Sequence, residues 1–156
     1  MGAAARVLVV DDDGIMLASV SRILSRQGYE VFPASGPRRA LEIVKTRPSV
    51  QLVLADVAMP EMRGTQLIAE VFRLSPQTAG LLMTGEVRPS DVPEGVAVLR
   101  KPFSTAELIL AVQLTLTQSA KLHSRMRQLA DRYKRLRSEL QAAVEKSIKT
   151  MRQVIG

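Results

Sequence analysis

The stretch "QLVLADVAMPEMRG", residues 51–64, decides how this chain folds, because in it an apolar run ends in a single carboxylate. The run at residues 51–55 is short and almost wholly apolar, which is typical of a strand buried on both faces. An unpaired charge inside a core costs several kcal/mol, so Asp56 is expected where the strand emerges. A lone acid in that place is either an incidental surface residue or a reactive group.

Four more short apolar runs have the same character. They are residues 6–11, 30–33, 80–84 and 96–100. The segments between the runs carry apolar residues at helical spacing, such as Ile15, Val20, Ile23 and Leu24. Gly28 predicts the end of that first helix, and Ser104 with Glu107 predicts a capping box at the start of the last one. Five strands alternating with helices predict an α/β fold, a doubly wound five-stranded parallel sheet covered on both faces.

Polar residues gather at the carboxyl ends of these strands, the edge at which open α/β sheets bind ligands. The first strand ends in Asp11, Asp12 and Asp13, the third in Asp56, the fourth in Thr84, and the fifth in Arg100 and Lys101. Clustered carboxylates repel one another unless a cation neutralises them, and an all-oxygen site with open positions suits Mg²⁺. Asp56 could then attack a phosphoryl group whose oxygens contact Thr84 and Lys101. Asp13 is assigned mainly to the N-terminus of the following helix.

Four fragments together resemble the receiver domain of bacterial two-component response regulators, across about residues 5–118. They are "VLVVDDD" (7–13), "LVLADVAMPEMRG" (52–64), "LLMTG" (81–85) and "LRKPF" (99–103). The resemblance implies a flavodoxin-like sheet of strand order 2-1-3-4-5 and a cis Lys101–Pro102 bond.

The same resemblance assigns roles to residues of the predicted site. Asp56 is the phosphoacceptor served by a sensor histidine kinase, Thr84 the switch hydroxyl and Lys101 the cation that pairs with the phosphate. The implied Mg²⁺ ligands are Asp11, Asp12, Asp56 and the backbone carbonyl of Ala58. Such a domain is not an enzyme beyond its self-catalysed phosphotransfer and autodephosphorylation.

The sequence also departs from the family pattern. Val98 stands where the family often has an aromatic residue that rotates on phosphorylation, so the usual aromatic switch cannot operate. Residues 85–95 contain Pro89 and Pro93, which predicts that the fourth helix is one short turn or absent, and makes dimerisation through its surface doubtful. Gly85 follows the switch hydroxyl where the family often has Ala, which would leave the phosphoryl group more open to water.

The C-terminal part has a different composition. Residues 1–120 hold 12 Lys/Arg and 12 Asp/Glu, whereas residues 121–156 hold 10 and 3, so the whole excess of +7 lies in the tail. No Pro or Gly occurs from Ser104 to Ile155. Apolar or small residues recur there in alternating steps of four and three, at Leu108, Val112, Thr115, Ser119, Leu122, Met126, Leu129, Tyr133, Leu136 and Leu140. This spacing predicts a coiled coil, with a stutter after Leu140 through Val144 and Ile148.

The coiled coil leads to a prediction about partners. The simplest partner is a second copy of the chain in a parallel homodimer, although antiparallel and four-helix arrangements stay open. Thr115 and Ser119 are small and polar, so the pairing should loosen there, or this face belongs to the receiver core. Tyr133 is an awkward fit in a tight two-stranded coil. We assign residues 1–118 to the receiver and 119–156 to a helical extension or linker, beyond which an output domain is expected.

Composition excludes several other classes. Zero Cys, no signal peptide and no run of roughly 20 apolar residues favour a cytoplasmic chain without a membrane span. The basic residues of the tail are read as a solvated face, His123 is read as a solvated histidine, and no direct nucleic-acid binding is expected. A haloacid-dehalogenase-like phosphatase would need a second Asp where Ala58 stands. An oligomerisation module with an inactive receiver, and a stand-alone receiver that docks onto a partner, are the remaining alternatives.

Overall fold

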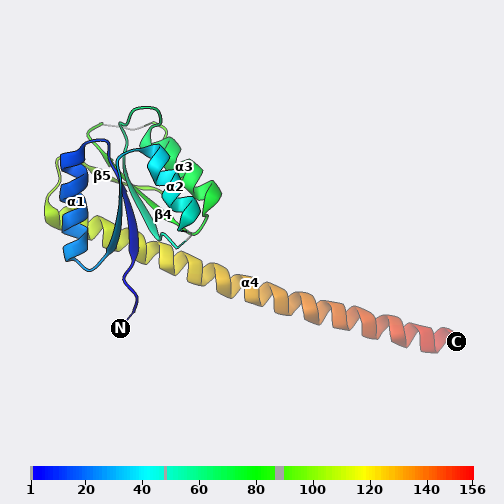
Figure 1. Cartoon of the computed structure of the whole chain (residues 1–156). Coiled ribbons are helices and arrows are strands. Elements are labelled where there is room, and N and C mark those ends of the chain that lie inside the picture. Colours follow the sequence, from blue (N-terminus) through cyan, green and yellow to red (C-terminus); the bar gives the residue numbers. More distant parts are fainter. Residues whose placement is uncertain (1, 48, 87–89) are drawn as a thin grey trace. The chain divides into compact units, whose positions relative to one another are not determined.

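The structure is a computed structural model that describes residues 2–47, 49–86 and 90–156. In chain order the elements are β1 (Arg6–Val10), α1 (Gly14–Arg26), β2 (Glu30–Ala34), α2 (Pro37–Thr46), β3 (Leu52–Asp56), α3 (Gly64–Leu74), β4 (Ala79–Thr84), β5 (Ala97–Arg100) and α4 (Thr105–Ile155). All strands pair in parallel in the order β2-β1-β3-β4-β5, which confirms the predicted doubly wound sheet (Figure 1).

Side chains alternate between the two faces of the sheet, as the strand period of two requires. On one face, Val7 and Val9 of β1 pack with α1 and with the first turns of α4. On the other face, Leu8 and Val10 pack with α2 and α3 (Figure 1). The central strands β1, β3 and β4 are therefore buried and apolar along most of their length, and the polar residues Asp11, Asp56 and Thr84 come where these strands end.

The residues predicted to mark the ends of the first helix lie at the ends of α1. Asp13 caps α1, because its carboxylate accepts hydrogen bonds from the backbone N–H groups of Ile15 and Met16. Gly28 follows α1 with a φ of +88°, a backbone conformation that residues other than glycine rarely adopt. One residue of the predicted apolar set differs, since Ile15 is 85% exposed in the first turn of α1. The Lys101–Pro102 bond is cis, as predicted.

The segment between β4 and β5 contains no helix in residues 85–86 and 90–96, the part of it that the structure describes. This agrees with the prediction of a short or absent fourth helix, although Pro89 itself lies outside the described residues. Val92 and Val96 are partly buried against the core formed with α2 and α3. The described part of this segment therefore packs two apolar side chains against the core.

The chain divides into two compact units, Met1–Ser119 and Ala120–Gly156. Leu108, Val112 and Thr115 of α4 are buried in the first unit, so these positions of the apolar repeat belong to its core. In the second unit the repeat continues along an exposed stripe from Leu122. The functional division at residue 118 and the coiled coil stay predictions. No described helix has the length and apolar composition that a membrane span requires.

Candidate functional site

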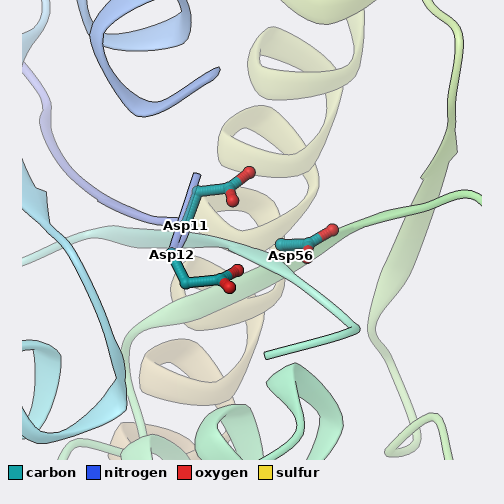
Figure 2. Close-up of side chains that lie close together, drawn as sticks. All are labelled: Asp11, Asp12 and Asp56. Carbon is teal, nitrogen blue, oxygen red and sulfur yellow. The ribbon is translucent and has the colours of Figure 1, made fainter. Parts of the chain in front are cut away.

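Three carboxylates meet at the carboxyl edge of the sheet. Asp11 and Asp12 directly follow β1, and Asp56 is the last residue of β3. β1 and β3 are neighbours with Val10 opposite Ala55, so the acidic residues that follow Val10 and Ala55 lie at the same edge of the sheet. One ligand oxygen from each of the three carboxylates lies within 4.8 Å of the other two (Figure 2). The structure thus brings the predicted acidic cluster together.

Asp56 is only 7% exposed, and Lys101 provides its counter-charge. The Lys101 Nζ donates a hydrogen bond of 2.8 Å to Asp56 Oδ1 and lies 3.7 Å from Asp11 Oδ2. Burial lowers the pKa of Lys101, but its hydrogen bond to Asp56 and the charges of Asp56 and Asp11 together outweigh burial and raise it. Lys101 is therefore a cation at neutral pH, and a buried carboxylate is tolerated at position 56.

Asp11 is 1% exposed, and only one of its two carboxylate oxygens accepts a hydrogen bond. Its Oδ1 accepts a 2.9 Å hydrogen bond from the Asp13 N–H, whereas its buried Oδ2 has no hydrogen-bond partner. Burial raises the pKa of Asp11, and the charge of Asp56 adds to this rise, although the Asp13 N–H opposes it. A buried carboxylate oxygen without a hydrogen-bond partner, beside two more carboxylates, fits a hard divalent cation such as Mg²⁺.

Thr84 and Ala58 lie beside this cluster in the chain and in the sheet. Thr84 is the last residue of β4, is 1% exposed, and accepts a 2.9 Å hydrogen bond from the Glu86 N–H. β4 neighbours β3 with Met83 opposite Asp56, so Thr84 stands at the same edge. Ala58 is exposed in the loop two residues after Asp56. The roles of both residues stay predictions.

Gly64 contributes to the site through a close backbone contact with Asp56, which no sequence pattern indicates. A β-carbon at Gly64 would overlap the backbone carbonyl oxygen of Asp56 and lie 2.9 Å from its carbonyl carbon. The Gly64 N–H also donates a 2.9 Å hydrogen bond to the carbonyl of Val57. The start of α3 therefore lies against the backbone that carries the Asp56 carboxylate.

The sheet order and the carboxylate cluster at its carboxyl edge define the class of CheY-like α/β proteins. Within this class the chain belongs to the response regulator receiver domain family, whose sequence model matches residues 7–113.

Individual relatives agree with this assignment. The chain is 30% identical over 113 residues to the response regulator receiver protein CpdR of Brucella abortus, with 69% of this chain and 93% of CpdR covered. It is 32% identical over 124 residues to the transcriptional regulatory protein GlrR of Escherichia coli, covering 74% of this chain but only 27% of GlrR. A solved CheY-like receiver domain from Methanospirillum hungatei has a TM-score of 0.68 and 27% identity, covering 76% of this chain and 98% of that one.

Proposed function

We propose that this chain accepts a phosphoryl group from a sensor histidine kinase onto Asp56 in a Mg²⁺-dependent reaction. The supporting observation is the buried Asp56 carboxylate, held by Lys101 at 2.8 Å and grouped with Asp11 and Asp12. One Asp56 oxygen would attack the phosphorus of a phosphohistidine. The P–N bond would break, its electron pair would stay on the imidazole nitrogen, and an aspartyl phosphate would form.

The surrounding residues have separate tasks in this proposal. The Lys101 ammonium pairs with a phosphoryl oxygen, and the Thr84 hydroxyl donates to another. Asp11, Asp12, Asp56 and the Ala58 carbonyl would hold Mg²⁺, which would neutralise the charge gathered at the site. Water later attacks the phosphorus and restores the carboxylate. Apart from these self-catalysed steps we propose no enzymatic activity.

We further propose that the second unit carries the signal through a homodimer, to an output domain or to a partner protein in the cytoplasm. The support is its exposed apolar stripe, which recurs at coiled-coil spacing. The stripe consists of Leu122, Met126, Leu129, Tyr133, Leu136, Leu140, Val144, Ile148, Met151 and Ile155. A stand-alone receiver that docks through this helix is the second candidate, because the match to CpdR covers 93% of that protein.

The test is phosphorylation by acetyl phosphate with Mg²⁺, followed by intact mass measurement. The wild-type chain should gain one phosphate, and a chelator or the Asp56→Asn substitution should abolish the gain. Asp13→Asn is the matched control and should still be phosphorylated, since Asn also caps helices. An unmodified wild-type chain, or equal labelling of Asp56→Asn, would overturn the proposal. Steady release of phosphate from many esters would instead indicate a phosphatase.

A further inference from the structure

Arg63, the residue before α3, binds two acidic residues of the segment that follows β4. Its Nη1 and Nη2 donate to the two carboxylate oxygens of Glu86, each at 3.1 Å. Its Nε and Nη2 donate to Asp91 at 3.2 and 3.4 Å. This fork-to-fork pairing with Glu86 fixes direction as well as distance, as bidentate Arg–carboxylate pairs do.

Asp91 is held from a second side by α3. The Thr65 hydroxyl, on a residue that is 1% exposed, donates a 2.5 Å hydrogen bond to Asp91 Oδ2. This hydrogen bond is the main cause that lowers the pKa of Asp91, and Arg63 adds to it. Hydrogen bonds to Glu86 and Asp91 raise the pKa of Arg63. Arg63 and Asp91 are therefore charged at neutral pH, and Arg63 forms ion pairs with both Asp91 and Glu86.

This network reaches the phosphoacceptor site by two short routes. On one side, Arg63 adjoins Gly64, which lies against the backbone carbonyl of Asp56. On the other side, the backbone N–H of Glu86 donates to Thr84 Oγ1 at 2.9 Å. The Glu86 side chain is thus fixed by Arg63 while its backbone fixes the hydroxyl of Thr84.

We propose that Arg63 is a positioning residue that lengthens the life of the aspartyl phosphate by holding Glu86, and through Glu86 the Thr84 hydroxyl. This inference rests on the proposed function of Asp56. The lifetime ends when a water oxygen attacks the phosphorus, the P–O bond to Asp56 breaks with its electron pair left on the carboxylate, and the water proton passes to solvent.

Arg63 slows this attack in two ways. It keeps Thr84 oriented as a donor to the phosphoryl oxygens, and it occupies both oxygens of a carboxylate that could otherwise accept the proton of the attacking water. Apart from its two chain neighbours, no described residue has an atom within 4 Å of a β-carbon added at Gly85, and these open surroundings make such restraint of Glu86 consequential.

The experiment compares the decay of the phosphorylated full chain after acetyl phosphate is removed, followed by intact mass. Arg63→Ala should gain one phosphate like the wild type but lose it about five-fold faster, the rate effect of one ordinary hydrogen bond. Arg73→Ala is the matched control, because Arg73 lies in the last turn of α3 and pairs with Glu70 at 2.6 Å, with no ion pair to the described residues of the segment after β4.

Two further variants separate positioning from a general loss of structure. The reversed pair Arg63→Glu with Glu86→Arg should have a longer lifetime than either single reversal, although Asp91 would lose its cation and keep the lifetime below that of the wild type. Unchanged decay in Arg63→Ala, or equal acceleration in Arg73→Ala, would overturn the inference and leave the phosphoacceptor role intact. Absence of phosphorylation in the wild type would instead remove the proposed function on which the inference rests.

Discussion

The position of Asp56 depends on two neighbours, one that supplies a positive charge and one that lets the backbone pack closely. Lys101 supplies a positive charge 2.8 Å from its carboxylate, which offsets the cost of burying an anion. Gly64 supplies only the absence of a side chain, because the start of α3 lies against the Asp56 carbonyl. The carboxylate is therefore placed by a side-chain interaction on one side and by backbone packing on the other.

The packing requirement at Gly64 predicts the effect of a single methyl group. Gly64→Ala would force the end of β3 and the start of α3 apart, because the atoms in contact are backbone and cannot rotate away. We expect a loss of about 1–3 kcal/mol in the free energy of unfolding. We also expect slower phosphorylation by acetyl phosphate. Urea unfolding and intact mass measure the two effects.

Gly14→Ala is the control for this prediction. An added β-carbon at Gly14, the first residue of α1, meets no atom within 4 Å among the described residues outside its own helix turn. Its stability should stay within about 1 kcal/mol of the wild type or rise, because Ala costs less conformational entropy than Gly. Equal stability of Gly64→Ala and Gly14→Ala would contradict the packing argument.

The site residues whose position follows from strand ends can be predicted from the sequence. Asp11, Asp12 and Asp56 are predicted to lie close together because the carboxyl ends of parallel strands lie at one edge of the sheet. Gly64 and Arg63 could not be found in this way. Their partners are a backbone carbonyl and the side chains of a segment without regular structure, and no periodic pattern reports such contacts.

At the scale of elements, the N-terminus of α4 is fixed by a reciprocal pair. The Ser104 N–H donates a 2.7 Å hydrogen bond to Glu107 Oε2, and the Glu107 N–H donates a 3.1 Å hydrogen bond to Ser104 Oγ. This is the capping box that the sequence predicted. The hydrogen bonds to Ser104 lower the pKa of Glu107.

The lowered pKa of Glu107 gives its contribution to stability a definite pH dependence. A carboxylate whose pKa is lower in the folded state stabilises that state fully above its ordinary value of 4.5, and the stabilisation is lost as the pH falls through the lowered value. Glu107→Gln should therefore be less stable than the wild type at neutral pH. The difference should shrink towards zero below the lowered pKa.

Thermal unfolding of both chains between neutral and acidic pH measures this difference. Glu94→Gln is the control, since Glu94 is exposed in the segment before β5 and outside any helix terminus. A gap between Glu107→Gln and the wild type that stays constant over the whole range would count against an ionised capping carboxylate.

The repeat along α4 shows where a sequence pattern stops being specific. Leu108 and Val112 follow the same spacing as the later stripe, yet they are fully buried in the first unit. A helix that packs on a sheet and a helix that packs on a partner both need apolar residues at three- and four-residue steps. Periodicity therefore predicted the helix, and burial was needed to show where its packing role changes.

At the scale of the whole molecule, the charge of the second unit bears on how two copies would pair. Arg132 and Arg137 flank the apolar stripe on opposite sides, one residue before Tyr133 and one after Leu136. In a parallel dimer Arg132 would face Arg137 of the partner subunit, and two Tyr133 rings would share one layer. In an antiparallel dimer whose register places Tyr133 on Leu136 of the partner subunit, Glu139 would face Arg132 of the partner subunit. The charges and the ring therefore favour antiparallel pairing.

Two single substitutions distinguish these arrangements. Glu139→Arg should weaken self-association by about five- to ten-fold at low salt, because two symmetric attractive pairs become repulsive. Arg137→Glu should change it little. Sedimentation equilibrium of the full chains at low and high salt measures both, and the effect of Glu139→Arg should fade as salt screens the charges. The reverse result, with Arg137→Glu tightening the dimer and Glu139→Arg neutral, would establish parallel pairing. A wild-type chain that stays monomeric at every concentration would contradict both arrangements.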